Sequence, residues 1–137
     1  MKPVFADTFY WIALTNPKDS AHRRALDFGR VLDSRLIITT DEVLTELLAF
    51  CASDPQLRVE AALAVQDILG AEAVRVIAQT HRSFLDGLEL YRMRPDKGYS
   101  LTDCVSMQAM RSEALTEVLT NGRHFEQEGF RALFRTL

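Results

Sequence analysis

Three acidic residues of this chain lie just past the ends of β-strands in the predicted secondary structure: Asp7, Glu46 and Asp103. If the fold gathers their carboxylates, the mutual repulsion would be costly unless a cation lay among them. Carboxylate oxygens are the ligands that hard divalent cations such as Mg²⁺ and Mn²⁺ prefer. We therefore expect Asp7, Glu46 and Asp103 to be metal ligands and catalytic residues.

Two of these acids also have a structural explanation. Asp7 precedes a predicted helix, where aspartate commonly caps the free amides of the first turn. Asp103 closes the sequence Ser100-Leu101-Thr102-Asp103, which matches a capping box at the start of a helix. A metal site is favoured because a parallel sheet brings the carboxyl ends of its strands together at one edge.

Glu46 must be distinguished from Glu42, which lies one turn earlier in the same predicted helix. The pattern Thr39-x-x-Glu42 fits a capping box, so we expect Glu42 to serve the helix end. Glu46 lies beyond that turn, beside an apolar stripe, and is expected to point toward a neighbouring element, although an exposed helix glutamate is the alternative. The buried stripe is predicted to consist of Val43, Leu44, Leu47, Leu48 and Cys51.

Short runs typical of strands alternate along the chain with longer stretches of helical period. This alternation predicts parallel strands joined by crossover helices, with ligands bound beyond the carboxyl ends of the strands. A length of 137 residues without a linker predicts one domain over residues 1–137. The predicted strands are Val4–Ala6, Leu36–Thr39, Val74–Ala78, Val118–Thr120 and a last one near Phe130–Phe134, and the predicted helices include Ser20–Leu32, Asp41–Cys51, Gln56–Leu69 and Thr80–Arg92.

The composition is that of an ordinary globular protein, with 47% apolar and 26% charged residues. No apolar run is long enough to cross a bilayer and no signal-peptide core precedes Asp7, so we expect a cytoplasmic protein without a membrane partner. A net charge of −3 argues against a large basic surface for nucleic acid but permits a short local groove. Cys51 and Cys104 are interpreted as buried free thiols, and the histidines lack the spacing of a zinc site.

Four short segments, in a fixed order along the chain, carry a resemblance to a known family. They are Asp7-Thr8 with Trp11, then Val43-Leu44-x-Glu46-Leu47-Leu48, then Ser100-Leu101-Thr102-Asp103, and finally Thr120-Asn121-Gly122-Arg123-His124-Phe125 followed by Glu126 to Phe130. In this order they resemble the motifs of the PIN-domain ribonucleases, and most of all the VapC-like toxins of type II toxin–antitoxin pairs. The likeness extends over the whole length of the chain.

The resemblance implies a three-layer α/β/α sandwich around a central parallel sheet, with the acids in a pocket at the strand ends. It implies an endoribonuclease that uses Mg²⁺ or Mn²⁺, held by Asp7, Glu46 and Asp103, to hydrolyse RNA phosphodiester bonds. The products would carry a 5′-phosphate and a 3′-hydroxyl. The implied partners are the RNA substrate, a cognate antitoxin that covers the active-site groove, and a second copy of the chain in a homodimer.

The sequence departs from the family at the fourth acidic position, where the T-x-D motif has Gly122. Glycine offers no ligand, which bears on the presence of a second metal ion. The neighbouring Asn121 has a carbonyl oxygen that could contact a metal directly or through water, although Asn-Gly is also a strong turn dipeptide. Arg123 and His124 flank this motif and could contact RNA phosphate, or could be solvated surface residues.

Hydroxyl side chains lie next to the acidic motifs. Thr8, Ser100, Thr102 and Thr120 could orient metal ligands or waters. Local caps and turns explain the same residues comparably well. The sequence leaves both interpretations open.

Two other functions are compatible with parts of the pattern. The first is a non-catalytic RNA- or protein-binding module in which Gly122 marks a degraded site. The second is a phosphatase of the haloacid dehalogenase type, whose first strand also ends in aspartate. That family requires a second aspartate two residues later, where this chain has Phe9, so the phosphatase ranks low.

Overall fold

The computed structural model of the chain describes residues 2–32 and 34–135. Its centre is a sheet of five short parallel strands in the order β3-β2-β1-β4-β5. The chain moves outward from β1 to β3 and then returns to the other side of β1, so the topological switch point, where ligands bind in such sheets, lies between β1 and β4. The strands are Val4–Ala6 (β1), Ile37–Thr40 (β2), Val74–Ile77 (β3), Glu117–Leu119 (β4) and Arg131–Ala132 (β5).

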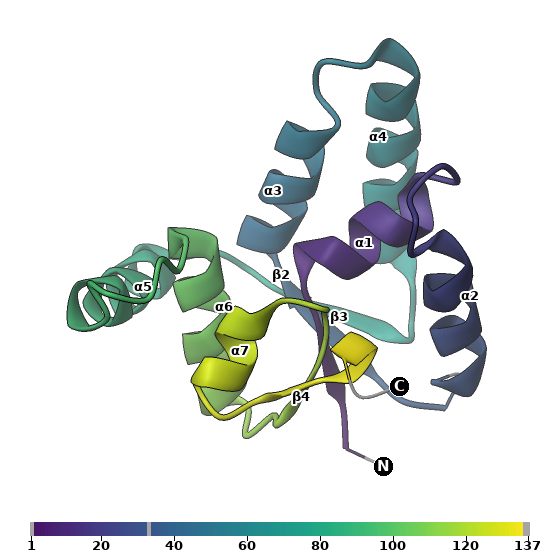
Figure 1. Cartoon of the computed structure of the whole chain (residues 1–137). Helices are drawn as coiled ribbons and strands as arrows, with labels where there is room; N and C mark the ends of the chain where they lie inside the picture. Colours follow the sequence, from purple (N-terminus) through teal and green to yellow (C-terminus); the bar gives the residue numbers. More distant parts are fainter. Residues whose placement is uncertain (1, 33, 136–137) are drawn as a thin grey trace.

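Helices cover the sheet on both sides (Figure 1). In the first half of the chain they are α1 (Thr8–Thr15), α2 (His22–Val31), α3 (Asp41–Phe50) and α4 (Pro55–Gly70). In the second half they are α5 (His81–Met93), α6 (Leu101–Ser112) and α7 (Arg123–Gln127), followed by a 3-10 turn at Leu133–Arg135. The predicted α/β fold with a central parallel sheet is confirmed.

The element bounds follow the prediction closely at the centre of the sheet and less closely at its edge. Strand β1 has the predicted bounds, and all three of its residues are fully buried. The last predicted strand, Phe130–Phe134, contributes only Arg131–Ala132 to the sheet. Leu133 and Phe134 leave the sheet in the 3-10 turn, where both side chains are buried. Their apolar character therefore reflects core packing and not strand pairing.

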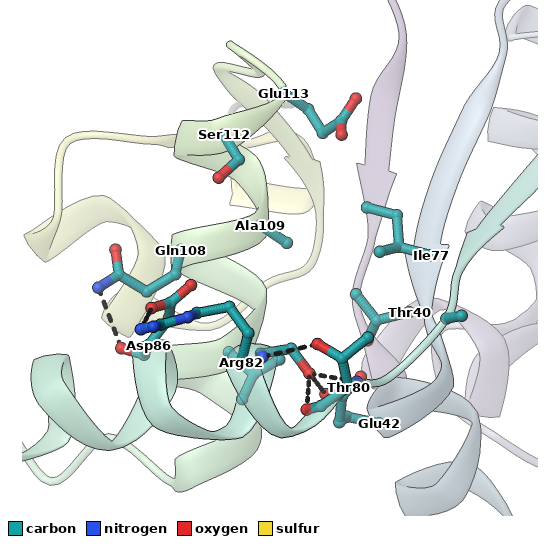
Figure 2. Close-up of a pocket in the computed structure, with 13 residues that line it drawn as sticks. Thr40, Glu42, Ile77, Thr80, Arg82, Asp86, Gln108, Ala109, Ser112 and Glu113 are labelled. Atoms are coloured by element: carbon teal, nitrogen blue, oxygen red, sulfur yellow. Dashed lines mark hydrogen bonds and ion pairs between the residues drawn. The ribbon is translucent and has the colours of Figure 1, made fainter.

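The prediction that Thr39-x-x-Glu42 forms a capping box is wrong. The residue that caps α3 is Thr40, whose hydroxyl oxygen accepts a hydrogen bond from the Val43 amide at 3.1 Å. Thr39 instead donates its hydroxyl to the carbonyl of Ala6 in the adjacent strand at 2.9 Å. Glu42 accepts a hydrogen bond from the Ser83 hydroxyl at 2.7 Å and lies beside the start of α5 (Figure 2).

The apolar stripe of α3 is buried except at one position. Val43, Leu44, Leu47 and Cys51 are buried, whereas Leu48 is 40% exposed. The prediction for Leu48 is therefore wrong. Helices α3 and α4 form a hairpin that projects from the sheet (Figure 1), so the core covers only one side of α3.

Helices α5 and α6 are held unusually close by a glycine. A Cβ atom at Gly87 would lie 2.5 Å from Cγ2 of Val105 and 3.2 Å from its backbone nitrogen. Only a residue without a side chain allows the two helices to approach this closely. The position of α5 is thereby tied to α6, the helix that carries Asp103.

Candidate active site

Asp7 lies at the switch point of the sheet, between the end of β1 and the start of α1. It occupies the N-cap position, but its carboxylate makes no capping hydrogen bond. Instead, its Oδ2 accepts a hydrogen bond from the hydroxyl of Thr120 at 2.9 Å. Thr120 directly follows β4, which pairs with β1, so the neighbouring strand ends bring the two side chains together. The capping interpretation does not account for this carboxylate.

The carboxyl group of Asp7 is in an environment that disfavours its charge. Burial and then repulsion from Asp103 raise its pKa from 3.8 to about 7, with a smaller contribution from Glu46. Hydrogen bonds from the Thr120 hydroxyl and the Thr8 amide act in the opposite direction. Both other acids therefore contribute to the raised pKa of Asp7.

Glu46 lies in the second turn of α3 and is partly buried. Its Oε1 accepts a hydrogen bond from the hydroxyl of Thr8, at the first position of α1, at 2.5 Å. The side chain therefore points toward a neighbouring element, as predicted. The same hydrogen bond ties α3 to the residue that follows Asp7.

The ends of β1 and β2 are fixed behind the acids by a buried chain of hydrogen bonds. The indole N–H of Trp11 donates to the hydroxyl oxygen of Thr39 at 3.2 Å. Thr39 in turn donates to the Ala6 carbonyl. These contacts hold α1 against the strand ends and so support the position of Asp7.

Asp103 lies in the first turn of α6, after the loop that follows α5, and not directly past a strand as predicted. The predicted capping box is present: Oδ2 of Asp103 accepts a hydrogen bond from the Ser100 amide, and the Ser100 hydroxyl accepts one from the Asp103 amide, both at 3.0 Å. Nδ1 of His124, in α7, lies 3.1 Å from the same Oδ2. The capping contact occupies one carboxylate oxygen, so it is compatible with a ligand role for the other.

The other predicted site residues divide into two groups. Thr8, Thr120 and His124 each contact one of the three acids. For Thr102 and Asn121 the described residues provide no such contact: Thr102 lines a separate hollow, and the exposed Asn121 accepts a hydrogen bond from Arg135 through its backbone carbonyl. Arg123 is exposed at the start of α7.

The carboxylate oxygens of Asp7, Glu46 and Asp103 are ligands that suit Mg²⁺ or Mn²⁺. Within residues 2–32 and 34–135, no three acidic, histidine or cysteine side chains are close enough together to form a metal-binding group. On the other hand, no basic side chain in this part of the chain forms an ion pair with Asp7 or Glu46. Asp7 and Glu46 therefore lack a protein cation, whereas Asp103 lies beside His124. Mg²⁺ commonly keeps several waters among its ligands.

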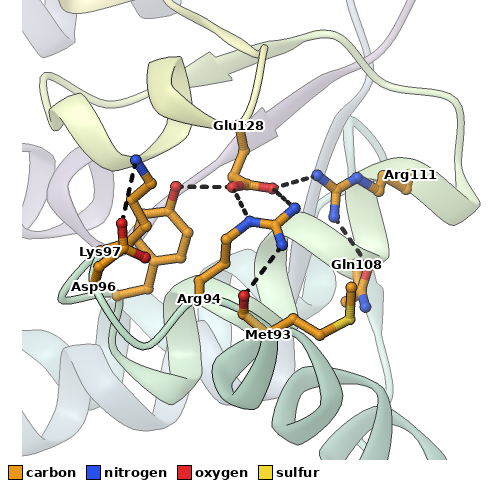
Figure 3. A network of polar contacts seen from close by, with 8 residues as sticks. Met93, Arg94, Asp96, Lys97, Gln108, Arg111 and Glu128 are labelled. Carbon is orange, nitrogen blue, oxygen red and sulfur yellow. Dashed lines mark hydrogen bonds and ion pairs between the residues drawn. The ribbon is translucent and has the colours of Figure 1, made fainter.

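A second polar cluster contacts His124 through Tyr99 and was not predicted from the sequence. Glu128 is the centre of this cluster, where it accepts hydrogen bonds from Arg94 and Arg111 and from the Tyr99 hydroxyl (Figure 3). The Tyr99 ring lies 5.1 Å from the His124 ring, measured between centroids. The cluster thereby joins the loop after α5, helix α6 and the end of α7 around the residue that contacts Asp103. These residues are far apart in sequence, and no local pattern signals their contact.

Within the part of the chain that the structure describes, no helix combines the length and apolarity needed to span a membrane.

A family model described as "PIN domain" matches residues 4–130. A comparison with curated protein sequences gives no match. Among solved structures, VapC20 of Mycobacterium tuberculosis, described as a sarcin–ricin loop cleaving toxin, is 25% identical, with a TM-score of 0.80 over 93% of this chain and 95% of VapC20.

Proposed function

Because the chain belongs to the PIN domain family, with a match over residues 4–130, we propose that it is a metal-dependent endoribonuclease and the toxin of a toxin–antitoxin pair. The similarity of its fold to VapC20, a toxin that cleaves the sarcin–ricin loop, supports RNA as the substrate. In this proposal residues 1–137 form one nuclease domain that acts in the cytoplasm. Its protein partners would be a cognate antitoxin and a second copy of the chain.

The observation that carries the proposal is the environment of Asp7. Asp7 is 9% exposed, and the pKa of its carboxyl group is raised by burial and by the charges of Asp103 and Glu46. A buried acid whose ionisation is opposed by other acids is a candidate for binding a cation. In a purely structural role Asp7 and Glu46 would be expected to have basic partners, and among the described residues they form no ion pair. Asp103 has His124 beside it.

Asp7, Glu46 and Asp103 would hold the ion. A bound Mg²⁺ or Mn²⁺ supplies Lewis-acid activation of water and offsets the charge that develops on the phosphodiester. Thr120 holds one oxygen of Asp7 and Thr8 holds one oxygen of Glu46, so each hydroxyl orients a carboxylate toward the shared site. His124 and the Ser100 amide do the same for Asp103.

The test is RNA cleavage by the wild type and by Asp7→Asn and Asp103→Asn, with Mg²⁺, Mn²⁺ or EDTA. Intact ribosomes and total transfer RNA serve as separate substrates. We expect cleavage by the wild type only with metal, and a loss of about a hundredfold or more in either variant, as for removal of groups that act together. Equal activity in all three proteins would exclude the site, and activity in EDTA would exclude the metal.

A second candidate is a non-catalytic RNA- or protein-binding module of the same fold. Gly122 favours it, because the position of a fourth acid offers no ligand. Thermal unfolding measured with and without Mn²⁺ separates the two candidates. A functioning site predicts clear stabilisation of the wild type by Mn²⁺ and none of Asp7→Asn, whereas a degraded site predicts that Mn²⁺ leaves the melting temperature of each protein unchanged.

A further inference from the structure

We propose that the hollow at the start of α5 is a subsite for one unpaired base of single-stranded RNA, an inference that rests on the proposed ribonuclease function. The hollow has a volume of about 450 Å³. The residues on which the argument depends are Glu42, Gln79, His81, Phe84 and Thr102, all of which line it. None of them is needed to hold the metal.

Two residues that line the hollow are close in sequence to the predicted metal ligands. Thr102 immediately precedes Asp103, and Glu42 lies one helical turn before Glu46. A neighbouring pocket of about 230 Å³ shares Glu42 and other lining residues with the hollow (Figure 2). The two pockets therefore adjoin each other along α5, and neither is lined by Asp7, Glu46 or Asp103. RNA bound at the acids could extend into them.

An exposed aromatic pair provides the surface for stacking. Phe84 is 44% exposed, and the His81 ring is stacked with it at 6.1 Å between centroids and an interplanar angle of 19°. A phenylalanine on solvent-facing helix surface contributes little to the core. RNA-binding proteins commonly stack splayed bases on such rings, because every base has a π face.

The aromatic pair is rigidly placed relative to both acid-bearing helices. The Ser83 side chain completes the capping box of α5 with Thr80 and donates its hydroxyl hydrogen bond to Glu42 in α3. Contact between Gly87 and Val105 fixes α5 against α6. A platform held in this way loses little freedom when a base binds.

The polar groups of the hollow suit a neutral base and not a phosphate. No lysine or arginine from the described residues lines it, whereas Glu42 contributes a carboxylate. The side-chain amide of Gln79 and the hydroxyl of Thr102 form no hydrogen bond with the described parts of the chain. They offer donors and acceptors for the edge of a base or for a 2′-hydroxyl.

The test measures binding in EDTA, so that it does not depend on cleavage. Fluorescein-labelled decamers of each single base, and one mixed-sequence duplex, are titrated with the wild type and variants while anisotropy is recorded. We expect Phe84→Ala to weaken binding of single strands about tenfold, and Phe84→Trp to stay within about twofold of the wild type. Gln79→Ala, which leaves the aromatic pair intact, should weaken binding about threefold, as for one lost hydrogen bond.

The matched control is Phe50→Ala, which removes a similarly exposed phenylalanine from the end of α3, 60% exposed and outside the hollow. It should bind RNA as the wild type does. Duplex binding should be unchanged in Phe84→Ala, because paired bases cannot reach the platform. Sedimentation of each variant establishes whether Phe84 contacts a second copy of the chain instead.

Several results would overturn the subsite: equal binding by Phe84→Ala and Phe50→Ala, an equal loss for the duplex, no binding of any single strand, or dissociation of a dimer by Phe84→Ala. Its failure is distinguishable from failure of the nuclease. Metal-dependent cleavage with unchanged binding in Phe84→Ala would remove the subsite alone. Weakened binding without any cleavage would retain the subsite and remove the nuclease.

Discussion

Two carboxylates of this molecule, Asp7 and Glu128, are both shielded from solvent but have opposite surroundings. Burial and neighbouring acids raise the pKa of Asp7 to about 7. Burial also opposes the ionisation of Glu128, but hydrogen bonds from Arg94, Arg111 and Tyr99 outweigh it and lower the pKa to about 2. A carboxylate whose charge is satisfied by arginines stabilises the fold, whereas the charge of Asp7 has no basic partner among the described residues. The contrast therefore lies in the partners of the two carboxylates and not in burial alone.

The largest expected effect is a gain of stability on removing the charge of Asp7. In the unfolded chain Asp7 titrates near 3.8, so between about pH 4 and about pH 7 the folded state retains a proton that the unfolded state has lost. The stability of the wild type therefore falls as pH rises through this window. Asp7→Asn should be more stable than the wild type by up to about 4 kcal/mol at pH 8 in EDTA, and about equal at pH 4.

Urea unfolding at the two pH values measures this difference. The control is Asp67→Asn, on the exposed surface of α4, which should change stability by no more than about 0.5 kcal/mol. If Asp7→Asn were destabilising at pH 8, the carboxylate would be serving the fold, and the contrast with Glu128 would be lost.

Glu128→Gln should change the folding stability in the opposite direction, as a loss. The side chain of Glu128 is 4% exposed and pairs with two arginines that are partly solvated. We expect a loss of about 3 kcal/mol near pH 7, at the lower end of the range for breaking a buried ion pair. Because the folded pKa is depressed, the contribution of Glu128 is present above its ordinary value of 4.5 and is lost as pH falls toward 2.

The matched control for this variant is Glu126→Gln, which removes an ion pair with Arg135 in which both side chains are more than a third exposed. It should cost less than about 1 kcal/mol, as surface pairs do. Equal losses in the two variants would show that the cluster around Glu128 is no stronger than an ordinary surface contact.

Addition of Mn²⁺ should offset the loss of folding stability that the buried charge of Asp7 causes. At pH 8, a free Mn²⁺ concentration of about a hundred times the dissociation constant should stabilise the wild type by about 2.7 kcal/mol. The effect should weaken below pH 7, because protons compete with the metal for the carboxyl group of Asp7. Thermal unfolding with and without Mn²⁺ provides the measurement, and Glu128→Gln should retain the metal effect. Equal stabilisation of Asp7→Asn would mean that the ion binds elsewhere.

The contrast also explains which parts of the molecule the sequence could reveal. Strand β1 and the apolar side of α3 were predictable, because their burial follows from local period. The cap of α3 was not, because Thr39 and Thr40 are adjacent and chemically alike, and only the contact with Ala6 removes Thr39 from that role. Tertiary contacts of this kind have no local signature.

Among the site residues, too, some positions were predictable from local sequence and others depend on tertiary contacts. Asp7 was predictable from its place after a strand of apolar residues. Its hydrogen bond with Thr120 joins positions 113 residues apart, and the cluster around Glu128 spans the loop after α5, helix α6 and the end of α7. Family motifs located the acids, but only the folded chain distinguishes acids that repel one another from an acid held by arginines.

The smallest predicted effect comes from adding a fourth acid where the family has one. At Gly122 the backbone φ is −76°, and a Cβ atom would make only an ordinary contact, 3.5 Å from Oγ1 of Thr120. Gly122→Asp should therefore fold normally and tighten Mn²⁺ binding about tenfold, equivalent to about 1.4 kcal/mol, measured by calorimetry. Because Gly122 is also the N-cap of α7, Gly122→Asn is the control, since it can cap the helix without adding charge. Equal affinity in the two variants would place the metal away from this position and limit the functional acids to the original three.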